Sequence, residues 1–195
     1  QKDGSSKYSF YFSGHNHTTH RKEIGVAVSD NPTGPFVASE QPIVTAADRP
    51  NGVGGGQAID VDVFTDPKTG KHYLYWGNGF MAGAELNSDM MSIKKETIVN
   101  LTPEGGNLDT WAYREAPYVI YRKGTYYFMW SVDDTGSPNY HVCYATSQPT
   151  LPKSPLKVNP DNYNVLKQVP TDKIYGPAHN SVLQVPGKDE WYIVY

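Results

Sequence analysis

The sequence predicts an all-β protein built as a β-propeller, and three observations support this fold class. The 195 residues include 15 tyrosines and 18 glycines, and aromatic residues make up 13% of the chain, a composition typical of strands joined by tight turns. Apolar residues at helical spacing are nearly absent. Strand-like runs recur in the same order along the chain, which favours a propeller over a plain β-sandwich, the alternative fold.

The most regular part of the repeat is a run of aromatic residues. It appears four times, at residues 8–13 (YSFYFS), 73–77 (YLYWG), 126–131 (YYFMWS) and 191–195 (WYIVY). Successive runs start 65, 53 and 65 residues apart, which leaves room for several antiparallel strands in each unit. We therefore interpret each unit as one propeller blade.

Further strand-like runs complete the units. They precede the last three aromatic runs and follow the first and third, at residues 58–64, 116–121, 181–185, 23–29 and 141–147. Turn sequences separate them, the earliest at residues 2–5. The best helix candidate is the short segment 92–98, which lacks a clean apolar stripe.

The repeated runs also predict the core. Trp76, Trp130 and Trp191 lie inside the aromatic runs, so we expect all three in the packed interior. Cys143 lies in a strand next to a tyrosine, and we expect it to be a buried, small apolar residue.

One polar residue stands at or near the start of each strand that precedes an aromatic run. Asp60 lies 13 residues before its aromatic run, Glu115 lies 11 before, and His179 lies 12 before. The first strand of a propeller blade lines the central channel, so equivalent positions face the same axis. We expect two carboxyl groups and an imidazole to meet there. The same offset from Tyr8 places a fourth polar residue upstream of Gln1.

Two carboxyl groups across one pocket suit glycoside hydrolysis, in which one acts as general acid on the leaving oxygen and another as general base on water. Glu115 stands in the run Arg114-Glu-Ala-Pro-Tyr-Val, whose apolar residues remove it from water and so favour the protonated acid. Strand alternation places Asp62 on the same face as Asp60, where it would be a supporting group or face a turn.

Aromatic side chains next to these residues are candidates for stacking on a sugar ring. They are Trp111 and Tyr113, shortly before Glu115, and Tyr175, before His179. Packing between blades is the alternative for each of them.

Two other clusters favour simpler interpretations. His15, His17 and His20 lie in a predicted hairpin loop, and because their spacing fits no standard zinc motif we interpret them as a solvated or substrate-facing loop. The glycines of residues 51–56 precede no helix, so they predict a flexible loop leading to Asp60 rather than a phosphate site.

Composition excludes several classes of protein. The charge of −3, with 17 basic and 20 acidic residues, argues against a nucleic-acid partner. No apolar run reaches the roughly 18 residues of a membrane-spanning helix, and one cysteine excludes an internal disulfide. Because the sequence stops inside the run 191–195, we expect a piece of a longer protein, in which a signal peptide would not be visible.

Several segments resemble glycoside hydrolase family 43, in the order in which that family has them. They are Ile59-Asp-Val-Asp-Val-Phe with His72-Tyr-Leu-Tyr-Trp-Gly, Glu115-Ala-Pro-Tyr-Val, Tyr175-Gly-Pro-Ala-His-Asn-Ser-Val and Pro186-Gly-Lys-Asp-Glu-Trp-Tyr-Ile-Val-Tyr. The segment Ile24-Gly-Val-Ala-Val-Ser-Asp-Asn-Pro resembles the first blade of that family. The resemblance extends over essentially the whole chain.

The resemblance implies a five-bladed propeller, with residues 1–195 as a single catalytic domain truncated at both ends and covering roughly blades one to four. By motif position, Glu115 would be the general acid, and Asp60 the carboxylate that tunes its protonation and orients it. His179 would be the central histidine, which in many relatives lies beside a calcium ion or water. The general base would be an aspartate upstream of Gln1, in agreement with the repeat.

The resemblance also implies the reaction. We expect an inverting, exo-acting α-L-arabinofuranosidase, with β-xylosidase as the alternative, acting on arabinose- or xylose-containing plant polysaccharides or oligosaccharides. The reaction requires no cofactor, and a structural Ca²⁺ in the central channel, held near His179 through water, is a candidate. The expected partner is a saccharide, neither nucleic acid nor membrane, and the expected location is secreted or periplasmic in a bacterium.

Two further hypotheses stay open. An endo-arabinanase or galactan hydrolase of the same fold would shorten a polymer before releasing monosaccharide. A non-catalytic carbohydrate-binding propeller would lack the aspartate in blade one. Expressed alone, the chain is expected to fold poorly and to be inactive, because an unclosed propeller exposes strand edges.

Overall fold

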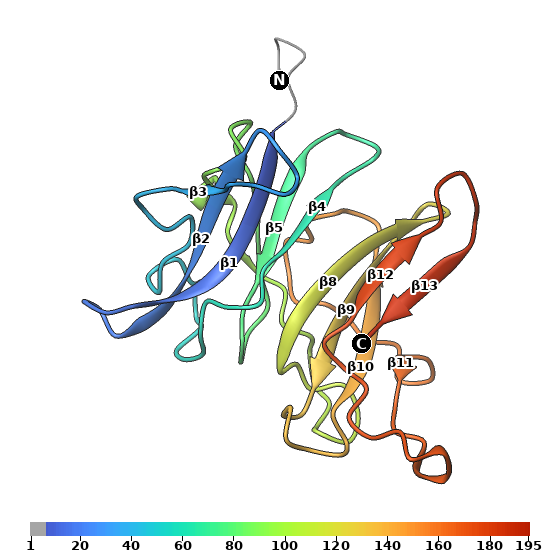
Figure 1. Ribbon diagram of the computed structural model, residues 1–195. Helices are drawn as coiled ribbons and strands as arrows, with labels where there is room; N and C mark the ends of the chain where they lie inside the picture. The colour runs from blue at the N-terminus through green and yellow to red at the C-terminus, as the bar shows by residue number, and fades with distance from the viewer. Residues whose placement is uncertain (1–6) are drawn as a thin grey trace.

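A computed structural model describes residues 7–195 and contains four antiparallel sheets that follow one another in chain order (Figure 1). We call these sheets blades one to four. The predicted turn at residues 2–5 lies outside the described residues. In the described part of the chain, no helix is long and apolar enough to cross a membrane.

Each blade is a meander in which sequential strands pair. Blade one contains β1 (Tyr8–Asn16), β2 (Arg21–Ser29) and β3 (Val37–Ala38), and blade two contains β4 (Asp62–Thr65), β5 (His72–Trp76), β6 (Ala82–Glu85) and β7 (Val99–Asn100). Blade three contains β8 (Glu115–Arg122), β9 (Thr125–Val132), β10 (His141–Ser147) and β11 (Asn164–Leu166), and blade four contains β12 (Ser181–Gln184) and β13 (Trp191–Val194). This succession of meanders confirms the predicted all-β propeller architecture.

Helical structure is limited to two short 3-10 turns in the described chain, η1 (Lys95–Thr97) and η2 (Pro170–Asp172). The predicted helix candidate at 92–98 is therefore reduced to η1, which buries none of its own residues. The two apolar residues of the segment, Ile93 and Ile98, both pack into the core, but they are five positions apart and do not form the apolar face of a helix.

The core lies between consecutive blades, because the aromatic strands β5 and β9 are buried on both faces. In β5, Leu74 and Trp76 pack with blade one, whereas Tyr73 and Tyr75 pack with blade three. This alternation is the period of two that a strand imposes on its side chains. A strand covered on both sides has no position for a solvated polar residue, which explains the run of apolar and aromatic residues in the sequence.

Blade three repeats this pattern. Phe128 and Trp130 of β9 pack against blade two, and Met129 packs with residues of blade four. The rings of Tyr75 and Phe128 meet edge to face, with centroids 5.6 Å apart, across the junction of blades two and three.

Three of the four predicted core residues are confirmed. Trp76, Trp130 and Cys143 are fully buried. The prediction for Trp191 is wrong, because this side chain is only half-buried on β13 and donates its indole N–H to Asp189. Trp191 faces an open groove between blades three and four, and this groove leaves the side chain partly exposed.

The predicted strand at 58–64 begins later than expected, because Asp60 has a left-handed backbone with φ of 56° and β4 starts at Asp62. Ala116 and His179, which come before or at the start of β8 and β12, have the same conformation, with φ of 55° and 51°. Strands require extended backbone, so a residue in this region interrupts the ladder. The register of β8 accordingly shifts between Glu115 and Tyr118.

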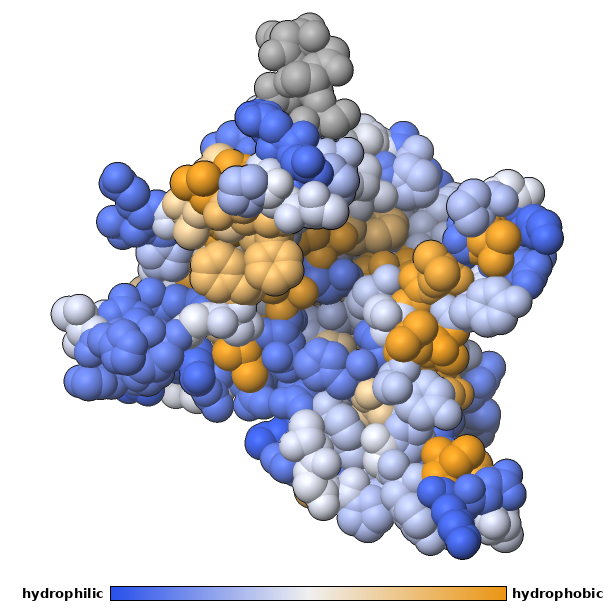
Figure 2. Space-filling view, in the orientation of Figure 1, coloured by the Kyte–Doolittle hydropathy of each residue, from blue (hydrophilic) through white to orange (hydrophobic). Residues whose placement is uncertain are grey.

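The outward faces of the first and last blades expose apolar side chains. Phe10 of β1 is 57% exposed, and Leu183, Tyr192 and Val194 of blade four are 61%, 54% and 59% exposed. Apolar groups are visible on the surface over blade one and over blade four (Figure 2). These two faces differ from the buried faces of blades two and three.

Candidate active site

Asp60, Glu115 and His179 come together at one point of the molecule. Each can present a carboxylate oxygen or imidazole nitrogen such that these atoms lie within 4.8 Å of one another. Among the described residues this is the one group of three acidic, histidine or cysteine side chains close enough to share a metal ion. The register of the repeat therefore located three residues that lie at least 55 positions apart in the sequence.

Glu115 is the most enclosed member of the group. It is the first residue of β8 and is only 8% exposed. The side-chain amide of Asn78 donates to its Oε2 at 2.6 Å, and the hydroxyl of Tyr140 donates to its Oε1 at 2.7 Å. Two donors on different oxygens fix the plane of the carboxyl group.

Asp60 has a left-handed backbone and lies two residues before the start of β4. Its backbone N–H donates to Ser13 Oγ at 3.1 Å, and its Oδ2 accepts the backbone N–H of Ala116 at 3.2 Å. Burial raises the pKa of Asp60, against the charge of His179, and the neighbouring Glu115 raises it further. A carboxyl group in this environment keeps its proton to a higher pH than one in water.

Asp62 faces β8 on the same side as Asp60, as predicted, although Asp60 lies outside the strand. Its Oδ2 accepts the backbone N–H of Val119 at 2.9 Å. Burial raises the pKa of Asp62 to about 7, against the hydrogen bonds from the N–H groups of Val119 and Val63. Asp62 thus connects blades two and three beside the cluster.

His179 is the exposed member of the group. Its backbone N–H donates to Ser131 Oγ of β9 at 2.9 Å. With Asp60, Asp62 and Asn180 it lines a cavity of about 360 Å³ between the first strands of blades two, three and four. The Oδ1 of Asn180 is buried there without a hydrogen-bond partner.

The three candidate sugar-stacking residues occupy different environments. Tyr113 donates its hydroxyl to the carbonyl of Gly77 at 2.6 Å, and burial, with the nearby Asp60 and Glu115, raises its pKa. Trp111 packs edge to face on Tyr163, with ring centroids 5.0 Å apart. Tyr175 is 56% exposed. Only Tyr113 is placed beside the carboxyl cluster by these contacts.

Four polar residues that contact the cluster were not predicted from the sequence: Ser13, Asn78, Ser131 and Tyr140. A signal for the two serines was present, because each directly follows the last aromatic residue of its run, Phe12 or Trp130. Asn78 and Tyr140 lie in loops before β6 and β10, where nothing in the sequence marks them.

The glycine segment is a loop, as predicted, and His17 and His20 lie in the predicted hairpin loop, whereas His15 belongs to β1. His15, His17 and His20 lie at the tip of the β1–β2 hairpin, with the ring of His15 5.5 Å from that of His17 and 6.2 Å from that of His20. Residues 51–56 contain no strand or helix. Among the described residues, the side chains of this hairpin do not form a group of three possible metal ligands.

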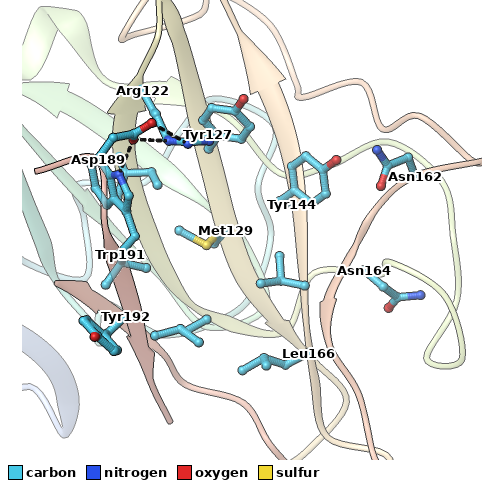
Figure 3. A pocket seen from close by; sticks show the side chains of 14 residues that line it. Arg122, Tyr127, Met129, Tyr144, Asn162, Asn164, Leu166, Asp189, Trp191 and Tyr192 are labelled. Atoms are coloured by element: carbon cyan, nitrogen blue, oxygen red, sulfur yellow. Dashed lines mark hydrogen bonds and ion pairs between the residues drawn. The ribbon is translucent and has the colours of Figure 1, made fainter. Parts of the chain in front are cut away.

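A larger groove, of about 620 Å³, lies between blades three and four (Figure 3). At one end of it Arg122 forms an ion pair with Asp189, whose carboxylate also accepts the indole N–H of Trp191. Its remaining lining is mostly apolar and aromatic, with Met129 and Tyr144 on its floor. No member of the carboxyl cluster lines this groove, whereas Asp60 and His179 line the smaller cavity.

Comparison with known proteins gives consistent matches. The family model described as glycosyl hydrolases family 43 matches residues 2–195. The β-D-galactofuranosidase xynD of Aspergillus niger is 36% identical over 179 residues, which cover 88% of this chain and 46% of that protein. A xylosidase/arabinosidase of Bacteroides ovatus is 28% identical over 87% of this chain and 54% of its own length.

Solved structures agree in fold. The α-L-arabinofuranosidase structure from Clostridium thermocellum superposes with a TM-score of 0.72 at 26% identity, over 97% of this chain and 57% of that one. The chain spans about half the length of these two curated relatives.

Proposed function

The chain belongs to glycosyl hydrolase family 43, and on that basis we propose that it forms part of a catalytic domain that hydrolyses glycosidic bonds in arabinose- or xylose-containing plant saccharides. The observation that carries this proposal is the Glu115 carboxyl group, enclosed at 8% exposure and grouped with Asp60 and His179. A carboxylic acid that can protonate the leaving oxygen is one of the two groups that glycoside hydrolysis needs, the other being the general base.

In the proposed mechanism, Glu115 gives its proton to the glycosidic oxygen as the bond from that oxygen to the anomeric carbon breaks. A water molecule attacks the anomeric carbon from the opposite face, and a general base takes the proton of that water. The product sugar then has inverted configuration. We propose that this base is an aspartate upstream of Gln1, where the repeat predicts a fourth polar residue. Asp60 would hold the backbone next to Glu115 in place through the N–H of Ala116.

For the substrate, we propose an α-L-arabinofuranoside cleaved in the exo mode. Support comes from the relatives, one named for galactofuranose and one for xylose and arabinose, and from the arabinofuranosidase structure. α-L-Arabinofuranosides and β-D-galactofuranosides share the same ring configuration and differ in the length of the exocyclic group, so one furanose pocket accommodates both rings. β-Xylosidase is the second candidate, because the Bacteroides ovatus relative carries both names.

The cavity at His179 also fits a calcium ion. Calcium prefers oxygen ligands, and the cavity lining offers the carboxylates of Asp60 and Asp62 and the unpartnered Oδ1 of Asn180. We propose that His179 and Asn180 hold such an ion through water. When bound, it would supply positive charge that favours ionised carboxylates nearby.

We further propose that the whole protein closes the ring with additional blade sequence. The apolar outward faces of blades one and four, with Phe10 and Leu183 57% and 61% exposed, would be buried by such closure. The saccharide would then bind at the end of the central channel where the carboxyl cluster lies.

The decisive experiment is proton NMR of arabinoxylan during digestion by the full-length parent protein. We expect free arabinose whose first-formed anomer is inverted relative to the glycoside. Released xylose would favour the second candidate, and retention of configuration would contradict the mechanism.

The matched control is Glu115→Gln, which keeps the size of the side chain and removes the proton. It should abolish cleavage of natural glycosides and spare aryl glycosides with good leaving groups, which need little protonation. Equal losses on both substrates would contradict the role of Glu115 as the acid. A folded parent that releases no sugar would favour a binding module.

A further inference from the structure

The junctions between blades share one hydrogen bond that reaches the candidate active site. At the first junction, Ser13 Oγ accepts the backbone N–H of Asp60 at 3.1 Å. At the third junction, Ser131 Oγ accepts the backbone N–H of His179 at 2.9 Å. Both serines directly follow the last aromatic residue of their run, so the same position of the repeat meets the site residue of the following blade.

The residues held in this way have a backbone that their side chains disfavour. Asp60 and His179 have φ of 56° and 51°, in the left-handed region. Residues other than glycine persist in such conformations when the surroundings over-determine them, and these conformations gather at functional sites. Here the serine hydroxyl of the preceding blade is the group that fixes the left-handed N–H.

At the junction of blades two and three, other residues hold the left-handed backbone. The position of the serine is taken by Gly77, where a Cβ would lie 2.0 Å from the carbonyl oxygen of Phe80 and where φ is 129°. A serine is therefore excluded. The left-handed residue of this junction is Ala116, with φ of 55°, and its N–H donates instead to Asp60 Oδ2.

Asn78, the next residue after Gly77, then reaches the site directly. Its amide donates to Glu115 Oε2 at 2.6 Å, and it is 7% exposed. On the other oxygen, Tyr140 donates at 2.7 Å. Burial raises the pKa of Tyr140, against its hydrogen bond to Ser131, so this hydroxyl remains a donor. Glu115 is thus held through its side chain, whereas Asp60 and His179 are held through their backbones.

We propose that Ser13, Asn78 and Ser131 are positioning residues, each of which holds the active-site residue of the following blade by one hydrogen bond. The inference rests on the proposed function, since it takes Glu115 as the acid. Asn78 sets the direction in which the Glu115 carboxyl group presents its proton. Ser131 sets the position of the His179 imidazole, and Ser13 that of the Asp60 carboxyl group.

The first test is Asn78→Leu in the full-length parent protein, a change that keeps the size of the side chain and removes the donor. With natural glycosides we expect kcat to fall about 10–100-fold with KM nearly unchanged, since small displacements of a catalytic group cost rates of this order. With aryl glycosides that carry a good leaving group, the loss should be under about 3-fold, since little protonation is needed.

Ser131→Ala is the second test, and it decides the matter if Asn78→Leu does not fold. We expect KM to rise about 3–10-fold with kcat nearly unchanged, because a displaced His179 weakens binding of the substrate equally in the ground state and the transition state. Ser29→Ala is the matched control: Ser29 is a buried serine whose hydroxyl also accepts a backbone N–H, that of Asn31, but it lies at the other end of the β1–β2 pair from Ser13. Ser29→Ala should change neither kcat nor KM.

The results separate the inference from the proposed function. Equal losses of kcat on both kinds of substrate for Asn78→Leu, or for Ser131→Ala a KM like that of Ser29→Ala, would overturn the inference while the parent still hydrolyses glycosides. A wild-type parent that releases no sugar would overturn the proposed function, and the inference with it.

Discussion

Asp60 lies just before β4 and Asp66 directly after it, and the fold shifts the pKa values of these two carboxyl groups in opposite directions. Asp66, directly after the strand, is 2% exposed and accepts hydrogen bonds from the hydroxyls of Tyr126 and Thr150, both in or beside blade three. The residues of its own turn, Lys68 and Thr69, provide two more. Burial opposes ionisation of Asp66, but these donors outweigh it and lower its pKa.

Asp60, before the strand, receives one backbone N–H within the described residues, and its pKa is raised. The comparison shows that burial alone does not decide what a carboxyl group does. Asp66, whose oxygens accept several hydrogen bonds, links blades two and three. Where donors are scarce, the group keeps its capacity to bind a proton or a ligand.

The largest expected effect is that of Asp60→Asn on activity. In the full-length parent protein kcat/KM for natural glycosides should fall about 10²–10⁴-fold, the range of a group that assists proton transfer. The free energy of unfolding should stay the same or rise, because the variant no longer desolvates an ionisable group. Steady-state kinetics and urea denaturation measure both quantities. If Asp60→Asn lost stability and kept its activity, Asp60 would have the same structural role as Asp66, and the contrast between them would be wrong.

Asp66→Ala should show the converse pattern. The free energy of unfolding should fall by roughly 3 kcal/mol, because buried hydroxyls of Tyr126 and Thr150 lose their acceptor. The kcat/KM of the folded protein should be unchanged. Urea denaturation at pH 7 measures the free energy of unfolding. If the urea concentration at the midpoint did not fall, the hydrogen bonds to Asp66 would not stabilise the protein.

The same variant should also change the response to acid. Because the pKa of Asp66 is lowered in the folded protein, its contribution to stability is present above the unfolded pKa of about 4 and is lost as the pH falls through the folded value. The wild-type protein should therefore lose more stability than Asp66→Ala below pH 4.

The smallest effect concerns Asp62, the first residue of β4. Its pKa of about 7 in the folded protein exceeds the unfolded value of about 4, so its contribution to stability is present below pH 4 and is lost as the pH rises to 7. Asp62→Asn should remove this slope and should be more stable than the wild type at pH 8 by roughly 2 kcal/mol. Urea denaturation at several pH values, compared between the two proteins, measures the difference. A parallel pair of profiles would show that Asp62 is ionised throughout.

Much of the fold followed from the sequence because strands covered on both faces leave a strong local pattern. The aromatic runs at 73–77 and 126–131 became β5 and β9, and the run 141–147 became β10 with the predicted bounds. The prediction failed where local pattern and long-range contact disagree. The segment 58–64 reads as one strand, but the backbone of Asp60 is turned by its bond to Ser13 in blade one.

The site was predicted in part for a similar reason. Asp60, Glu115 and His179 were located because the repeat places equivalent residues on one axis, and geometry of that kind is visible in spacing alone. Asn78 and Tyr140 were missed because they reach Glu115 from loops of two different blades. Loop conformation depends on packing between distant segments, which no spacing in the sequence records.

The sequence by itself determined the all-β class, the order of the blades and the three residues that meet at the centre. It did so because the periodicity of a strand and the spacing of a repeat can both be seen in the order of residues along the chain. Only the tertiary structure decided which carboxyl group is satisfied and which is not, since Asp66 and Glu115 both accept hydrogen bonds from a neighbouring blade. The protonation of a buried carboxyl group depends on the donors and charges that folding brings to it, and these are set when the blades pack.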